Sequence, residues 1–364
     1  MINNNHHSSQ KKVAILVEQA VEDLEFIIPC HALKQAGMDV VVLGSRMNEK
    51  YKGKRGKLSV QADGTTTEAI VDEFAAVVIP GGMAPDKMRR NCHTVCFVRE
   101  AMKQGKLIAA ICHGPQVLIE GDLLKGKQVT GFTAIRKDIS NAGANYIDEP
   151  VVVDGNLITS REPGDLAIFT TALLKRLGYG GKDANLPDEK DTSAEWWKLA
   201  DAWGGSTKNE IVKGLNIALG GERYSLEALE KYLEKESEQE VKNLFQEMII
   251  NKQSHIQKLE TYLHRLHEKP SFGANVANQY AKVKSALTGS DDIYQIRCAL
   301  GDVQTGIGDV SHLSAMYTDP VATAIFKEIY NDLGKYEQRL VELYRSRIAA
   351  GIKPPKPTSS AAVV

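Results

Sequence analysis

The stretch from residue 107 to residue 118 constrains the fold most strongly, because an apolar strand runs directly into a sharp turn and a helix. It reads Leu-Ile-Ala-Ala-Ile-Cys-His-Gly-Pro-Gln-Val-Leu. Gly114 allows close backbone approach, and Pro115 suits the first turn of a helix, where its missing N–H is not needed. This order of elements predicts a nucleophile elbow, which holds the Cys112 side chain above the carboxyl edge of a sheet.

Cys112 has two interpretations at this position. The free amides of the following helix point at the sulfur and lower a thiol pKa, so we expect Cys112 to be more ionised at neutral pH than an ordinary cysteine. The alternative is a small buried apolar residue at the end of a central strand. The adjacent His113, and a second glycine turn at Pro80-Gly81-Gly82 after another apolar strand, favour the nucleophile.

Short apolar runs alternate with amphipathic helical patterns from residue 11 to residue 178. This alternation predicts an α/β domain whose parallel sheet is covered by helices. Each predicted helix is followed by a glycine, a common C-terminal stop signal. We expect strands at 13–17, 40–43, 75–79 and 107–111, a hairpin at 151–158, and helices at 22–36, 92–104 and 164–177.

Composition excludes several classes of function. The 364 residues suffice for two domains, and 45 basic against 46 acidic residues give a net charge of −1. Neither nucleic acid nor an anionic membrane surface is therefore an expected partner. No apolar run approaches the ~20 residues of a membrane span. An odd number of cysteines without dense spacing favours a reducing, cytoplasmic compartment; they are Cys30, Cys92, Cys96, Cys112 and Cys298.

Four motifs together resemble the PfpI family. They are the elbow at 110–116, the turn Pro-Gly-Gly-Met-Ala-Pro-Asp at 80–86, the acidic Glu-Asp-Leu-Glu at 22–25, and Thr-Ser-Arg-Glu-Pro-Gly-Asp at 159–165. Members of that family include intracellular cysteine peptidases, glyoxalase III enzymes and protein deglycases on a flavodoxin-like sheet. The resemblance covers residues 11–178 and implies the same fold and a cysteine-dependent activity there.

The resemblance also assigns roles to residues. It implies that Cys112 is the nucleophile and that Glu25 hydrogen-bonds its sulfur and carries protons. The backbone N–H groups of Gly82 and His113 correspond to oxyanion donors. Because Glu25 lies in an otherwise apolar segment, burial is expected to raise its pKa toward the range useful for general acid and base catalysis.

Other positions of the resemblance depart from the family pattern. In the PfpI branch an acidic residue of a neighbouring subunit orients the histidine, and Asp86, shorter than the usual glutamate, stands there; this implies a homo-oligomer. Phe132 stands where relatives often carry tyrosine, which removes a hydroxyl from the pocket wall. Arg161 either binds a substrate carboxylate or, as we favour, forms a structural pair with Asp165.

The second half of the chain has a different character. Residues 179–208 hold all three tryptophans and predict a linker that becomes a short docking helix. Trp196 and Trp197 are expected to pin the two domains together, the alternative being an aromatic binding face. Beyond it, Ala218-Leu219-Gly220 recurs 81 residues later as Ala299-Leu300-Gly301. Each repeat predicts two long helices, so residues 209–350 resemble a ferritin-like four-helix bundle. The ends, 1–10 and 351–364, are expected to be disordered tails.

The bundle departs from the ferritin pattern at its metal ligands. A di-metal site needs about four carboxylates and two imidazoles facing inward. Only Glu222 and His255 remain at those positions, and Lys252 stands where a carboxylate is needed. We therefore expect no metal, an ion pair between Lys252 and Glu222, and a scaffold or interaction module that supports assembly.

These features predict a thiol enzyme without a cofactor. The favoured reaction is attack of Cys112 on the aldehyde of methylglyoxal or glyoxal, or on an early protein adduct of these dicarbonyls, to give a hemithioacetal. Glu25 and His113 would move protons toward a hydroxy-acid product. The alternatives are a peptidase with a triad of Cys112, His113 and Asp86, and a non-catalytic redox or stress sensor whose Cys112 is oxidised.

Overall fold

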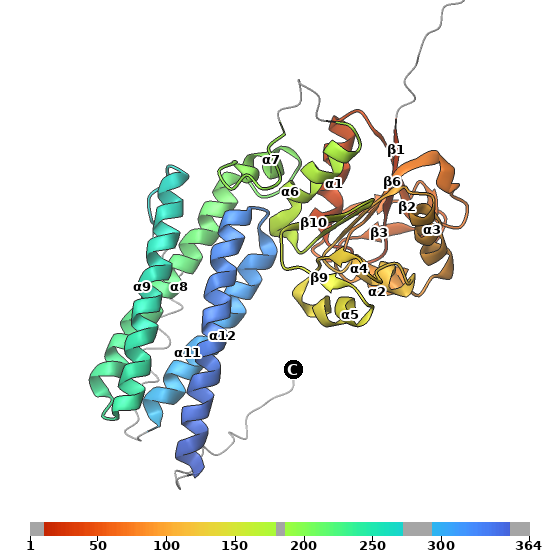
Figure 1. Cartoon of the computed structure of the whole chain (residues 1–364). Helices are drawn as coiled ribbons and strands as arrows, with labels where there is room; N and C mark the ends of the chain where they lie inside the picture. The colour runs from red at the N-terminus through yellow and green to blue at the C-terminus, as the bar shows by residue number, and fades with distance from the viewer. Residues whose placement is uncertain (1–10, 180–185, 272–292, 350–364) are drawn as a thin grey trace, which may run out of the picture. The chain divides into compact units, whose positions relative to one another are not determined.

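The computed structural model describes residues 11–179, 186–271 and 293–349, which fall into two compact units (Figure 1). The first unit ends at Lys208 and also includes Ala315–Pro320; the second holds Asn209–Ser314 and continues from Val321. The predicted tails at 1–10 and 351–364 lie outside the described residues. No described helix combines the length and apolarity needed to cross a membrane.

A seven-stranded sheet forms the centre of the first unit. Its order is β10-β11-β7-β6-β1-β2-β5, and all neighbours are parallel except the β10/β11 hairpin. The predicted strands are confirmed to within one or two residues at each end. The sheet strands are β1 (Lys12–Leu16), β2 (Asp39–Gly44), β5 (Gly64–Thr65), β6 (Phe74–Ile79), β7 (Leu107–Ile111), β10 (Val151–Asp154) and β11 (Leu157–Ser160).

Helices cover both faces of this sheet, which is why its central strands are apolar throughout. Helices α1 (Asp23–Gln35) and α6 (Leu166–Arg176) lie on one face and α3 (Cys92–Lys103) on the other (Figure 1). Their bounds confirm the predicted helices to within two residues. The remaining elements of this region are β3 (Lys50–Lys52), β4 (Ser59–Gln61), β8 (Gln128–Val129), β9 (Asn145–Tyr146), α2 (Ala84–Met88), α4 (Pro115–Glu120) and α5 (Arg136–Asn141).

The tryptophan-rich segment packs on the first unit. Trp196 opens helix α7 (Trp196–Ala202), is buried, and contacts Ala167 and Ile168 of α6. Its indole N–H donates to the carbonyl of Asp191 at 2.9 Å. Trp203 is also buried, in the main core beneath α1, whereas Trp197 is half-buried. Burial of two indoles against α6 and the core gives this segment its fixed position on the sheet domain.

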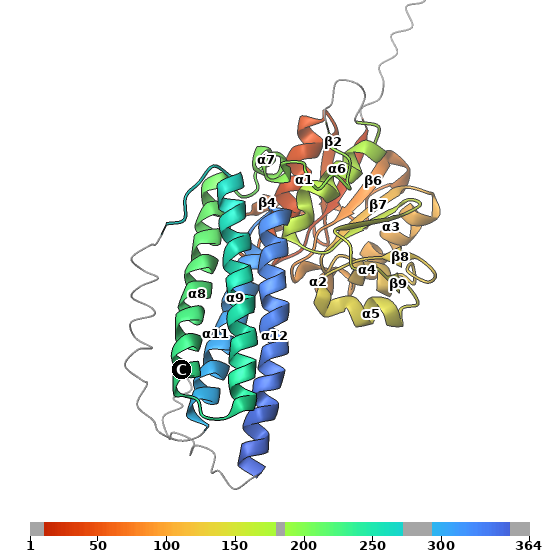
Figure 2. The same ribbon diagram turned by 60° about the vertical axis from the view of Figure 1, so that its left-hand side comes forward.

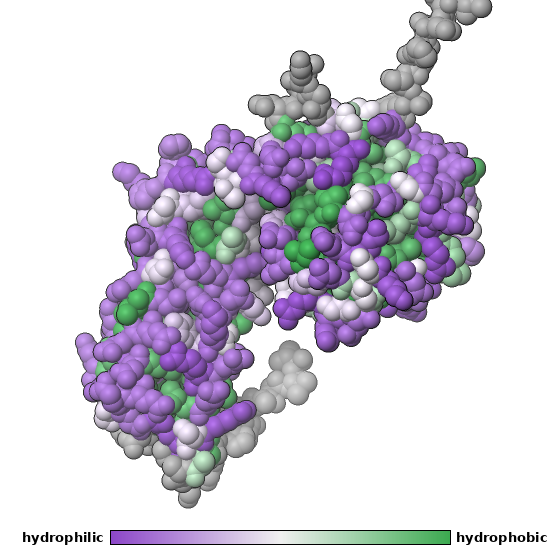
Figure 3. Space-filling view, viewed as in Figure 1, coloured by the Kyte–Doolittle hydropathy of each residue, from purple (hydrophilic) through white to green (hydrophobic). Residues whose placement is uncertain are grey.

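Four long helices make up the described part of the second unit (Figure 2). Each turns an apolar stripe inward; Phe245 and Phe326, which are repeat-related, are both fully buried. The visible outer face of this unit is mostly hydrophilic (Figure 3), as expected for amphipathic helices around one core. The helices are α8 (Lys208–Lys235), α9 (Gln239–Arg265), α11 (Tyr294–Met316) and α12 (Pro320–Ala349).

The repeat is visible in paired contacts between α9 and α12. Lys258 pairs with Glu328, and the residues 81 positions away, Arg339 and Glu247, form the corresponding ion pair at 2.6 Å. The two helix pairs are thus related by an approximate two-fold axis, and residues that correspond in sequence occupy corresponding positions across it.

Candidate functional site

The predicted elbow is confirmed at Cys112, which directly follows β7 and precedes α4. Its φ of +60° lies in the left-handed region, a conformation that costs a non-glycine residue about 1 kcal/mol. The Cys112 N–H donates to the Ser160 carbonyl at 3.0 Å, and the Gly114 N–H donates to the Ile111 carbonyl at 2.7 Å. A Cβ on Gly114 would lie 2.4 Å from the Ile79 oxygen, so the turn requires glycine there.

The thiol is buried where three separate segments meet. Cys112 is 6% exposed and Glu25, from α1, is fully buried. Glu25 Oε2 accepts the Gly81 N–H at 2.7 Å, and its carboxyl interacts with the Cys112 sulfur. The backbone N–H groups of Gly82 and His113 also point at this sulfur. The structure therefore brings together Cys112, Glu25 and both expected backbone donors.

Glu25 is a proton donor at neutral pH. Burial, together with the nearby Glu22 carboxylate, raises the pKa of Glu25 to about 8, although the Gly81 N–H opposes this rise. This confirms the pKa direction expected from the apolar segment. Glu25 Oε1 is buried and, within the described residues, accepts no hydrogen bond, so it is the oxygen that can carry the proton.

The expectation of a strongly ionised Cys112 is wrong. Burial and the Glu25 carboxylate raise the pKa of the thiol well above its usual range, and the N–H groups of Gly82 and His113 oppose this only in part. The amides at the start of α4 are too few to offset the loss of solvation. Since Cys112 and Glu25 are in contact, two negative charges on this pair are unfavourable, so the pair keeps at least one proton at neutral pH.

His113 lies beside the sulfur despite being its neighbour in sequence. Its Nδ1 is 3.3 Å from Cys112 Sγ, and its ring is 5.0 Å from the ring of Phe132 at an interplanar angle of 31°. Burial and Lys54 lower the pKa of His113, against the effect of Asp86. The imidazole is therefore neutral at pH 7 and can accept a proton, and its ring packs against that of Phe132.

Asp86 and Arg161 have different surroundings. Asp86 is exposed on α2 and acts on His113 through its charge; no hydrogen bond joins the two within the described chain. Its role across a subunit interface stays a prediction. Arg161 binds Asp165 through two hydrogen bonds of 2.9 and 3.1 Å and Asp148 through a third of 2.9 Å. The structural pair favoured from the sequence is thus confirmed.

Two buried carboxylates beside the site were not recognised as functional in the sequence. Glu22 is 2% exposed and pairs with Lys54 at 2.8 Å and Arg55 at 2.7 Å. Asp23 is fully buried and accepts the N–H groups of Arg55 at 2.8 Å and Leu58 at 2.7 Å. Together they hold the loop that carries Lys54, whose charge acts on Glu25 and His113. In the sequence, the pattern that could have indicated these buried carboxylates is three acids within four residues, next to an apolar run.

The helical unit carries its own buried charge cluster. Lys252 Nζ donates to Glu222 Oε1 at 2.7 Å, and His255 Nδ1 lies 2.8 Å from Glu222 Oε2. The predicted ion pair is confirmed. An ammonium group at this position occupies one of the carboxylate positions of a ferritin-like di-metal centre and repels cations, so these residues do not fit such a centre.

Comparisons with known proteins find relatives of the first unit. A model described as the DJ-1/PfpI family matches residues 11–176. The putative cysteine protease YraA of Bacillus subtilis (strain 168) is 43% identical over 167 residues, covering 46% of this chain and 98% of that protein. Protein/nucleic acid deglycase 2 of Escherichia coli (strain K12) is 40% identical over 169 residues, with the same coverage of each.

One solved structure matches both units. It is the crystal structure of a two-domain protein from Anabaena variabilis ATCC 29413 that contains DJ-1/ThiJ/PfpI-like and ferritin-like domains. It shares 76% sequence identity and a TM-score of 0.87, covering 97% of this chain and 100% of that chain. The chain therefore belongs to the DJ-1/PfpI family, with a flavodoxin-like α/β domain followed by an all-helical region that matches a ferritin-like domain.

Proposed function

We propose that the protein is a cysteine-dependent enzyme that converts reactive dicarbonyls to hydroxy acids, with methylglyoxal to lactate as the reference reaction. The observation that carries this proposal is the Glu25 carboxyl, with its raised pKa, held against the buried Cys112 sulfur. Such a pair suits addition of a thiol to a carbonyl, because the carbonyl oxygen needs a proton as the sulfur attacks. The burial of Cys112, which is 6% exposed, also favours a small electrophile over a folded protein.

The reaction can be written with these residues alone. Cys112 Sγ forms a bond to the aldehyde carbon, its proton passes to His113, and Glu25 protonates the carbonyl oxygen to give a hemithioacetal. The sulfur no longer accepts the N–H groups of Gly82 and His113 as strongly, so they can stabilise the developing oxyanion.

Proton transfer completes the conversion without an external oxidant. Glu25, now a carboxylate, removes the proton from the former aldehyde carbon, and the protonated His113 gives its proton to the ketone oxygen to form an enediol. Glu25 then protonates the adjacent carbon while the hydroxyl on the former aldehyde carbon returns a proton to His113. This oxidises one carbon and reduces its neighbour, which gives a thioester of lactate. Water then cleaves the thioester, releases lactate and returns the thiol. The net change is the addition of one water molecule to methylglyoxal.

Deglycation and peptide cleavage are the competing activities. The E. coli relative is named a deglycase, and the same hemithioacetal chemistry would act on early protein adducts of dicarbonyls. The B. subtilis relative is named a putative cysteine protease. Amide cleavage needs an oriented histidine to protonate the leaving amine. Since His113 receives no hydrogen bond from Asp86 in the described single chain, we place this activity second.

The decisive experiment mixes the full chain with methylglyoxal and follows dicarbonyl loss and lactate formation. Cys112→Ala should abolish lactate formation, whereas Cys96→Ala, at an exposed cysteine, should leave it unchanged. A fluorogenic peptide is tested in parallel. Peptide cleavage without dicarbonyl turnover would favour the peptidase. No turnover of either substrate, with reversible sulfenic acid at Cys112, would favour the redox sensor.

We further propose that the protein assembles as a homo-oligomer in a reducing, cytoplasmic compartment. All five cysteines are free, as expected there. In the oligomer, Asp86 of one subunit would orient His113 of another, with the helical bundle supporting assembly. Light scattering gives the subunit number. Mixing Asp86→Ala with Cys112→Ala should then restore part of the activity, because one kind of interface would combine an intact Asp86 with an intact Cys112 and His113.

A further inference from the structure

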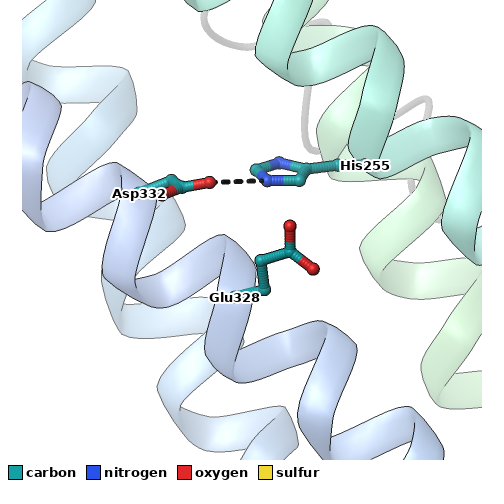
Figure 4. Close-up of side chains that lie close together, drawn as sticks. All are labelled: His255, Glu328 and Asp332. Carbon is teal, nitrogen blue, oxygen red and sulfur yellow. Dashed lines mark hydrogen bonds and ion pairs between the residues drawn. The ribbon is translucent and has the colours of Figure 1, made fainter.

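A second cluster of reactive side chains lies within the helical unit, outside the thiol site. It consists of His255 on α9 and Glu328 and Asp332 on α12 (Figure 4). One ligand atom from each residue lies within 4.8 Å of the others. Glu328 and Asp332 are one helical turn apart, so both carboxylates project from the same face of α12 toward the imidazole.

Both nitrogens of the His255 ring face carboxylate oxygens. The residue is 1% exposed, with Nδ1 at 2.8 Å from Glu222 Oε2 and Nε2 at 3.2 Å from Asp332 Oδ2. A neutral imidazole has a single N–H, so one of these contacts would leave a nitrogen lone pair facing an anion. A second proton or a metal cation at Nε2 removes this conflict.

We propose that His255 Nε2, Glu328 and Asp332 bind one divalent first-row transition metal, with zinc the best match, and that water completes the coordination. In a tetrahedral site with bonds of about 2.0–2.1 Å, two ligand atoms lie about 3.3 Å apart, close to the 3.2 Å between His255 Nε2 and Asp332 Oδ2. Glu222 would accept the Nδ1–H and orient the ring, as carboxylates beside metal-bound histidines do.

This site differs from the ferritin-like di-metal position. There, Lys252 neutralises Glu222, whereas the proposed cation sits on the opposite edge of the same imidazole, toward α12. The proposal replaces the expectation of a metal-free bundle and does not depend on the chemistry of Cys112.

Two lysines now neutralise the carboxylates of the cluster. Lys335 Nζ lies 2.8 Å from Asp332, and Lys258 pairs with Glu328. The lysine side chains are 72% and 44% exposed, so both can swing into solvent when a cation binds, because exposed ion pairs of this kind are weak. Glu328 itself is 42% exposed, which gives a metal ion a path from solvent.

The internal repeat supplies a natural control. The residues that correspond to Glu328, Asp332 and His255 by the 81-residue spacing are Glu247, Asn251 and Tyr336. That set keeps one carboxylate but lacks the second carboxylate and the imidazole. Glu247 pairs with Arg339 on α12 as Glu328 pairs with Lys258 on α9, so Glu247→Gln matches Glu328→Gln in charge and surroundings while leaving the cluster intact.

The test is equilibrium dialysis of the full chain, stripped with a chelator, against Zn²⁺. Cys112→Ala serves as the background, because it removes the thiol as a competing ligand. We expect one tightly bound zinc per chain. Glu328→Gln and Asp332→Asn should each weaken binding at least about tenfold, whereas Glu247→Gln should leave it unchanged. Substitution with Co²⁺ should give a visible absorption band that Asp332→Asn abolishes.

Circular dichroism of each variant separates lost ligands from lost folding, and Glu328→Gln, at an exposed position, is the variant least able to disturb the core. Equal zinc affinity in the Glu328, Asp332 and Glu247 variants would assign the metal to other groups, such as His6 and His7, and would overturn the proposal. Failure of the stripped chain to retain zinc would overturn it as well.

Discussion

Replacing Glu25 by glutamine tests the pKa of the buried carboxyl directly. In the folded protein the pKa of Glu25 is about 8, against an ordinary value of 4.5. Below pH 4.5 the group is protonated in both folded and unfolded chains and contributes nothing. Between pH 4.5 and 8 the unfolded chain loses the proton while the folded chain keeps it, so the free energy of unfolding falls as pH rises. Above pH 8 the full loss is present.

The size of this loss follows from the interval between the two pKa values. At ~1.4 kcal/mol per pH unit, the interval from 4.5 to about 8 corresponds to about 5 kcal/mol. Glutamine is similar in size, keeps an oxygen for the Gly81 N–H, and is uncharged at every pH. The stability of Glu25→Gln relative to the unmodified protein should therefore rise by about 4 kcal/mol between pH 5 and pH 8.5.

Urea unfolding followed by tryptophan fluorescence measures this difference. Trp196, Trp197 and Trp203 all belong to the unit that contains Glu25, so the fluorescence change reports unfolding of that unit. Glu120→Gln is the matched control, because the Glu120 side chain is 47% exposed and its charge is not penalised by burial. A stability difference for Glu25→Gln that does not change with pH would refute the assignment of a raised pKa to this residue.

Three further predictions concern the site and the bundle. Dicarbonyl turnover should fall as pH rises through about 8, where Glu25 loses the proton it donates; a pH–rate profile that stays flat across this range contradicts that role. Gly81→Ala would place a Cβ 2.6 Å from Glu25 Oε2 and 2.8 Å from Cys112 Cβ. We therefore expect a stability loss of about 1–3 kcal/mol in thermal unfolding and at least about a tenfold loss of lactate formation. Near-normal turnover would mean that the close approach of the Gly81 backbone to Glu25 and Cys112 is not needed. Lys252→Met should destabilise the bundle by about 3 kcal/mol in urea unfolding followed by circular dichroism, because it leaves the Glu222 charge buried with less compensation; the added change Glu222→Gln should restore much of the loss, and no restoration would contradict the pairing.

Much of the first unit could be predicted because its signals are local. Alternating apolar runs and helix-stopping glycines locate the strands and helices, and Gly114 and Pro115 after a buried strand specify the elbow without knowledge of distant contacts. The apolar surroundings of Glu25 similarly indicate a raised pKa. In the bundle, the resemblance to ferritin-like proteins puts Lys252, three residues before His255, where the Glu-x-x-His pattern needs a carboxylate, and this is enough to predict its pairing with Glu222.

The sequence by itself thus determined which segments become strands and helices, and which thiol and carboxyl can react. Only the tertiary structure decided the ionisation of Cys112, because helix amides, burial and Glu25 act on it with opposite signs and their balance depends on how deeply the sulfur lies. It also decided that His255 meets Glu328 and Asp332. His255 lies more than 70 positions before both acids, and only the packing of α9 against α12 sets which faces of the two helices meet.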